Sequence, residues 1–133
     1  MKTKSIQQEI LFNSKPEVIY NLFLNQETHS EITGSEVLMD TKINGHFSVF
    51  DGYCKGYNIE LSVNQKIVQA WNFDEEGWPE DHYSICTFVF EPTTDGTKLT
   101  FTQTEIPAHK AEELQRGWTD YYWEPIKEYL NAI

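Results

Sequence analysis

The sequence predicts an α+β fold in which a curved antiparallel β-sheet wraps around a long C-terminal helix, with two short helices after the first strand. Residues 45–105 alternate apolar and polar side chains between turn signals, which is typical of a meander of strands. Residues 108–133 return to a helical period with one apolar face. We expect a single domain over residues 1–133, because this length matches one ordinary domain and no linker or repeat interrupts it.

The N-terminal segment predicts one strand followed by two short helices. Residues 6–12 place isoleucine and phenylalanine side chains on one face at period two, as a strand does. The run Ser14–Glu17 predicts a helix start, because Ser14 can cap, Glu17 completes a capping box and the intervening proline suits the first turn. Residues 18–23 then carry an apolar helical face, and residues 26–32 predict a second short helix.

Five further strands are predicted in the middle of the chain. Asp51-Gly52 and Asp95-Gly96 are hairpin signals, and Asn64-Gln65 is typical of another turn. The alternating segments between these turns are 47–49, 57–61, 67–73, 83–91 and 99–104. The last of them carries threonines on one face, which we expect to point towards water.

The C-terminal segment predicts a long amphipathic helix with a kink. At 100° per residue its apolar arc contains Leu114, Trp118, Tyr121, Tyr122, Pro125, Ile126 and Tyr129. Pro125 removes the hydrogen bond to the Tyr121 carbonyl, so a kink is expected there. Gly117 is predicted to allow close approach of another backbone. Trp123 lies about 100° or more from the centre of the arc, which predicts an exposed contact residue.

The charge and cysteine content exclude several classes of protein. Acidic residues number 21 against 10 basic ones, giving a net charge of −11, so nucleic acid and anionic membranes are improbable partners. No run of seven apolar residues follows the N-terminal lysines and no window approaches a membrane span, so we expect neither a signal peptide nor a transmembrane helix. Cys54 and Cys86 are expected to be reduced core thiols, which predicts a cytoplasmic protein.

Four ordered segments resemble one family. These are Gly45–Tyr53, Ile67–Asn72 with Trp78-Pro79 after it, Gly96–Thr100, and Ile106-Pro107 followed by Gly117-Trp118 and Tyr121–Pro125. In this order they are similar to the Hsp90 ATPase activator homologue (AHSA1-like) family of the Bet v 1/START-like, helix-grip superfamily. The resemblance implies a helix-grip fold and docking on an Hsp90-type chaperone. The family's N-terminal Asn- and Trp-rich motif for ATPase stimulation has no counterpart in this sequence, so the resemblance does not extend to stimulation.

Aromatic residues supply the candidate binding site. A cavity between helix and sheet, of the kind that helix-grip folds keep, is predicted to hold a small hydrophobic ligand. Its candidate walls are Phe47, Tyr57, Trp71, Tyr83, Trp118 and Tyr122. The alternative is that these side chains simply fill the core, and a register slip of one residue would reverse every face.

Candidate partner-binding residues are Trp123 and the acidic run Asp74, Glu75 and Glu76. The run fits a basic partner surface, but a solvated loop is the ordinary explanation of such a cluster. We expect a monomer or a weak homodimer.

The sequence contains no recognised catalytic or metal-binding motif. It has no GxSxG elbow, P-loop or dinucleotide fingerprint, and its four histidines show no metal-ligand spacing. The sequence therefore predicts a non-enzymatic binding module with no catalytic residue, metal or cofactor. The alternative is a small cavity enzyme, cyclase-like or hydrolase-like, with Glu60, Glu91 or Glu105 as a buried acid.

Overall fold

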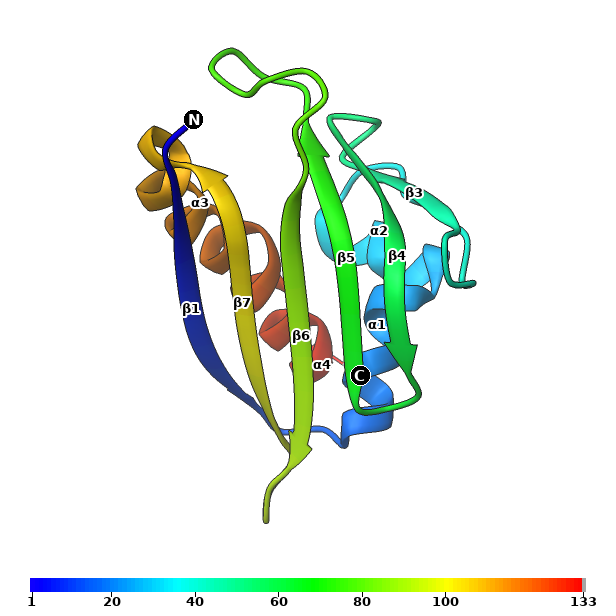
Figure 1. The fold of residues 1–133 in the computed structure, drawn as a ribbon. Helices are drawn as coiled ribbons and strands as arrows, with labels where there is room; N and C mark the ends of the chain where they lie inside the picture. The colour runs from blue at the N-terminus through cyan, green and yellow to red at the C-terminus, as the bar shows by residue number, and fades with distance from the viewer. Residues whose placement is uncertain (133) are drawn as a thin grey trace.

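Seven antiparallel strands form one open sheet in the computed structural model, which describes residues 1–132, with side chains through residue 131. The strands are β1 (Thr3–Phe12), β2 (Leu38–Met39), β3 (His46–Val49), β4 (Cys54–Ser62), β5 (Lys66–Phe73), β6 (Ser84–Pro92) and β7 (Thr97–Pro107). Their order across the sheet is β1-β7-β6-β5-β4-β3-β2, so the N-terminal strand pairs with the last one (Figure 1). All six predicted strands are present. The additional β2 has only two residues, which is too short for an alternating pattern to reveal.

The helices cover one face of this sheet. They are α1 (Pro16–Leu24), α2 (Gln26–Thr33), a 3-10 turn (Ala108–Lys110), α3 (Ala111–Trp118), a π-helical turn η2 (Thr119–Trp123) and α4 (Glu124–Ala132). Figure 1 shows the sheet curving around the C-terminal helical segment, with α1 and α2 beside it. This arrangement confirms the predicted α+β architecture and both short helices.

Inward-facing side chains of the sheet form the core with the C-terminal helix. Phe88 and Phe101 are cross-strand partners in β6 and β7, and both are fully buried beneath Trp118. The opposite face of β7 carries Thr100, Thr102 and Thr104, which were expected to point towards water and are half-buried in the structure. The period of two along these strands therefore decides which residues meet the helix.

The start of α1 differs from the prediction. Lys15 occupies the N-cap position and makes no side-chain capping bond, while Pro16 is the first helical residue. Ser14 lies one residue too early for a capping box, and its carbonyl instead accepts a 2.6 Å hydrogen bond from the Thr97 hydroxyl at the start of β7. The contact with the sheet, which the local sequence does not reveal, decides where this helix begins.

A π-helical turn corrects the predicted faces of the C-terminal helix. The Glu124 N–H donates to the Thr119 carbonyl, five residues back, just before Pro125. A π turn contains more residues than an α turn, so positions after it rotate away from a 100° wheel. Trp123 is consequently 2% exposed and stacks on Trp118 with ring centroids 5.6 Å apart, whereas Tyr121 is 61% exposed. The structure has this π turn just before Pro125, where a kink was predicted, and the prediction of an exposed Trp123 is wrong.

Three glutamines accept hydrogen bonds from the indole N–H groups of three buried tryptophans. Indole N–H groups donate from Trp71 to Gln69 at 2.9 Å, from Trp118 to Gln103 at 2.8 Å and from Trp123 to Gln8 at 2.9 Å. The three side-chain amides come from β5, β7 and β1 and all face the concave side of the sheet. A buried donor without a partner would cost about 1–3 kcal/mol, so these pairs allow tryptophan in the core.

Candidate functional site

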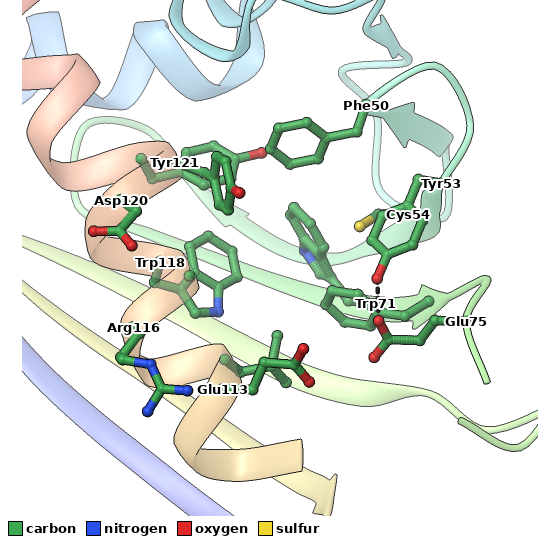
Figure 2. Close-up of a pocket in the computed structure, with 14 residues that line it drawn as sticks. Phe50, Tyr53, Cys54, Trp71, Glu75, Glu113, Arg116, Trp118, Asp120 and Tyr121 are labelled. Atoms are coloured by element: carbon green, nitrogen blue, oxygen red, sulfur yellow. Dashed lines mark hydrogen bonds between the residues drawn. The ribbon is translucent and has the colours of Figure 1, made fainter. Parts of the chain in front are cut away.

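A cavity of about 510 Å³ opens between β5 and the C-terminal helix. Half of its fourteen lining residues are aromatic. Trp71 and Phe73 come from β5, whereas Trp118, Tyr121 and Tyr122 come from the helix and its π turn (Figure 2). A volume of this size fits a small organic molecule.

The turn between β3 and β4 forms another wall of the cavity. Phe50 and Asp51 adopt left-handed backbone angles, with φ of 55° and 58°, and Gly52 follows at 93°. The turn brings the Phe50 ring within 6.0 Å of Tyr121 and 5.9 Å of Tyr122, in edge-to-face geometry. The turn is therefore fastened to the helix by aromatic contacts at the cavity.

Gly117 contributes open space to the cavity wall. A Cβ atom at this position would meet nothing nearer than a Tyr121 ring carbon at 3.9 Å. The prediction that Gly117 lets another backbone approach is therefore wrong. Its missing side chain instead leaves part of the cavity open.

A charged rim surrounds the aromatic walls. Glu113, Arg116 and Asp120 of the helical segment line the cavity, as do Tyr53 and Glu75. Figure 2 shows the Glu113 side chain directed towards Glu75, with Arg116 and Asp120 farther along the helix. The Tyr53 hydroxyl donates to Glu75, and the same carboxylate lies 3.3 Å from the Lys110 ammonium. Burial and the neighbouring Glu75 carboxylate raise the pKa of the Tyr53 hydroxyl, so it remains a neutral donor.

A buried histidine holds Tyr122 in the cavity wall. The Nδ1 atom of His29 lies 2.9 Å from the Phe23 carbonyl, which can only accept, so Nδ1 carries the proton. Nε2 then accepts a hydrogen bond from the Tyr122 hydroxyl, with a nitrogen–oxygen distance of 2.7 Å. Burial lowers the pKa of His29 to about 4, and burial also raises the pKa of Tyr122, so both groups are neutral. Because this hydroxyl is hydrogen-bonded to His29, Tyr122 lines the cavity with its aromatic ring and not with its hydroxyl.

The cysteine in the cavity wall is a buried, unreactive thiol. Cys54 lines the cavity but is 1% exposed, and both Cys54 and Cys86 are free thiols. Burial raises the pKa of each, which keeps the thiols protonated. Within residues 1–132 no three side chains of the types that ligate metals are grouped as a metal site requires.

The structure brings three of the six predicted cavity residues to the cavity. Trp71, Trp118 and Tyr122 line it, and their role in binding a ligand stays a prediction. Phe47 is buried behind Trp71, with ring centroids 5.2 Å apart, and does not line it. Tyr57 and Tyr83 contact each other at 5.6 Å, away from the cavity.

The inward position of Asn58 explains why Tyr57 faces outwards. Asn58 is fully buried, and its amide donates to the carbonyls of Asp40 at 2.7 Å and Lys42 at 3.0 Å. Its neighbour Tyr57 therefore points to the opposite face of β4. The prediction that Tyr57 and Tyr83 wall the cavity is wrong, because a polar residue is the buried one here.

The acidic run divides between solvent and cavity. Asp74 and Glu76 are exposed, whereas Glu75 turns towards the cavity. Trp123, the other predicted partner contact, is buried and cannot serve as a surface residue in this conformation.

Several cavity residues escaped the sequence prediction. They are Phe50, Tyr53, Phe73, Leu114, Gly117 and Tyr121. Two signals point to part of this set, namely the aromatic residues that flank the Asp51-Gly52 turn and the glycine beside Trp118.

The carboxylates required by the enzyme alternative lie in solvent. Glu60, Glu91 and Glu105 are all exposed, so none of them is the buried acid that this alternative needs. Among residues 1–132, no helix is both long and apolar enough to cross a bilayer.

Comparison with known proteins connects this architecture to one family. Residues 13–131 match the family model described as "Activator of Hsp90 ATPase homolog 1-like protein". The human "Activator of 90 kDa heat shock protein ATPase homolog 1" is 32% identical over 117 residues, covering 88% of this chain and 34% of the relative. The mouse homolog 2 is 30% identical over 120 residues, covering 90% of this chain and 36% of the relative. The chain thus spans about a third of the length of these curated relatives.

Solved structures agree with this family and with the fold. An HSP90 activator from Plasmodium falciparum superposes with a TM-score of 0.82 at 31% identity, covering 97% of this chain and 96% of that one. A protein from Mesorhizobium loti gives the same TM-score at 17% identity over 97% and 98% of the two chains, which supports the fold alone. The helix-grip fold implied by the sequence resemblance is confirmed.

Proposed function

This chain belongs to the family of activator of Hsp90 ATPase homolog 1-like proteins, and on that premise we propose that it is a non-enzymatic binding module that docks on an Hsp90-type chaperone. The observation that carries the proposal is the likeness to an HSP90 activator over 97% of the chain at 31% identity. The curated relatives are named as activators, and the matched region covers only 36% and 34% of them, so the proposal concerns docking and not ATPase stimulation.

Charge supports docking on a basic surface. The chain carries a net charge of −11, and Asp74 and Glu76 are exposed in the loop between β5 and β6. Complementary charge mainly accelerates association and is weakened by salt, since the Debye length shrinks from about 10 Å at 0.1 M to 3 Å at 1 M. The strength of such docking is therefore expected to depend on ionic strength.

Docking predicts salt-sensitive retention of the organism's Hsp90-type chaperone on the immobilised chain. We expect retention at about 0.05 M salt and a loss of most of it at about 0.5 M. The double variant Asp74→Asn with Glu76→Gln is expected to weaken retention several-fold at low salt. The matched control, Glu91→Gln with Asp95→Asn, removes one exposed charge near the end of β6 and one from the turn that follows it. An absence of retention at both salt concentrations would count against docking.

A second proposed function is the binding of a small hydrophobic ligand in the cavity. The observation in its favour is an aromatic cavity of about 510 Å³, within the range of small-molecule sites. Trp71, Trp118 and Tyr122 are the proposed contacts. An enzyme that uses this cavity remains the alternative, and it would need an acid other than Glu60, Glu91 and Glu105.

Filling the cavity through Gly117→Leu is expected to abolish ligand retention while leaving the fold intact. A Cβ atom at this position meets no close neighbour and the change replaces a helical glycine, so the free energy of unfolding should rise by up to about 1 kcal/mol. Native mass spectrometry of gently purified protein should show a retained mass in the parent chain and none in the variant. Gln115→Leu, at an exposed position of the same helix that does not line the cavity, is the control. A parent chain with a clean apo mass and no thermal shift across a panel of hydrophobes would contradict ligand binding.

We further propose a single domain over residues 1–133 that acts in the cytoplasm as a monomer or weak homodimer. The buried apolar residues of the helices and of six strands form one cluster, which supports a single domain. Two buried free thiols suit a reducing compartment.

A further inference from the structure

We propose that the cavity takes an organic cation, a small ammonium ion with an apolar or aromatic body. This inference rests on the ligand cavity of the proposed function and names the chemical class of its ligand. Two independent features of the cavity support it, namely the arrangement of its rings and the sign of its rim.

Half of the residues that line the cavity are aromatic, and some of their ring surface is open. Trp71 and Trp118 meet edge to face, at 62° and 5.1 Å between centroids, and so cover part of each other. Tyr121 is 61% exposed and Tyr53 is 40% exposed, so both leave ring surface open at the cavity. The face of an aromatic ring is electron-rich and attracts a cation within about 6 Å of the centroid. The open rings can therefore meet one ammonium group at the cavity.

The rim is negative even after its own ion pairs are counted. Glu75, Glu113 and Asp120 line the cavity against one cation, Arg116. Including the ion-pair partners Glu112 and Lys110 gives four carboxylates against two cations, an excess of two negative charges. The chain's own ammonium group, Lys110, already lies 3.3 Å from Glu75 and 3.7 Å from Glu113. This rim therefore stabilises ammonium groups and repels a carboxylate such as that of a fatty acid.

Three probes of matched shape and different charge test the inference. The para-hydroxyphenyl-trimethylammonium ion is the cation, para-tert-butylphenol is its neutral isostere and para-hydroxybenzenesulfonate is an anion. Calorimetry gives the affinities, and the indole N–H signals of the four tryptophans locate the binding, since Trp71 and Trp118 line the cavity. We expect the cation to bind about tenfold more tightly than the neutral isostere, and the anion not to bind.

Removing charge from the rim distinguishes a preference for cations from the binding of any ligand in the cavity. Glu113→Gln with Asp120→Asn changes two exposed rim side chains and should weaken the cation about fivefold while leaving the neutral probe unchanged. The matched control, Glu124→Gln with Glu128→Gln, removes two exposed charges of α4 outside the cavity and should leave both affinities within twofold. Equal binding of cation and neutral isostere, unaffected by the rim variant, would overturn the preference for a cation and leave the ligand cavity standing. If none of the three probes perturbs Trp71 or Trp118, both proposals fail.

Discussion

The Gly56→Ala variant is expected to lose most of its stability and to be unfolded or largely unfolded at 25 °C. Gly56 lies in the middle of β4, paired with Trp71 of β5. A Cβ atom there would lie well inside 3.0 Å of the Ala70 carbonyl oxygen and would also press on the Phe47 ring. The nearest atom is backbone, so no rotamer change relieves the clash, and β4 must separate from β5 beside the cavity wall.

We expect a loss of about 4–5 kcal/mol, which is most of the total for a domain at the lower end of the usual range of about 5–15 kcal/mol. Urea titration followed by circular dichroism measures the change. Gly117→Ala is the matched control, because the same methyl group meets open space in a helix and should stabilise the chain by about 0.5–1 kcal/mol. If the two alanine variants unfold at the same urea concentration, the close contact between β4 and β5 does not determine stability.

Strand and helix positions were predictable because a periodic pattern follows directly from burial on one side. Alternation predicted strands at 83–91 and 99–104, and in the structure their buried residues Phe88 and Phe101 are cross-strand partners. The same reasoning failed at Tyr57. An aromatic residue and an asparagine alternate there, and hydrogen bonds bury the asparagine instead. Hydropathy alone does not reveal that a side-chain amide can be buried when backbone carbonyl groups accept its hydrogen bonds.

The C-terminal helix marks a second limit of sequence reasoning. Its apolar period predicted the element, but a wheel of constant angle cannot represent the π turn over Thr119–Trp123. That turn exchanges the environments of Tyr121 and Trp123 and so decides which ring lines the cavity. The pairing of Trp123 with Gln8 joins residues 115 positions apart, and no local pattern encodes it.

The cavity could be predicted to exist, but only half of its proposed walls were correct. Trp71, Trp118 and Tyr122 were identified because aromatic residues on the buried face of a strand or helix must meet across the interior. Phe50 and Tyr53 reach the cavity from a turn whose left-handed residues redirect the chain. Turn geometry of this kind depends on tertiary contacts that side-chain periodicity does not report.

Acidification is expected to destabilise the chain through His29, the buried histidine that accepts a hydrogen bond from the Tyr122 hydroxyl. Burial lowers the pKa of His29 to about 4 in the folded chain, from 6.5 in the unfolded one. Between these values the unfolded state binds a proton that the folded state does not, so the free energy of unfolding falls as the pH falls. The loss of stability begins as the pH falls below 6.5 and amounts to about 3 kcal/mol when the pH reaches the folded pKa.

Replacing the titrating ring isolates this effect from that of the carboxylates. In His29→Gln the free energy of unfolding should be lower than in the parent chain near neutral pH, and the two curves should converge as the pH falls from 6.5 towards 4. His46→Gln, which removes an exposed imidazole, should run parallel to the parent chain throughout. Parallel curves for His29→Gln would mean that His29 titrates alike in both states. Protonation would also place a second donor at Nε2, against the Tyr122 hydroxyl that now donates to it. The acid-induced loss of stability should therefore be accompanied by displacement of the Tyr122 ring, visible as a shift of the Trp118 indole signal beside it.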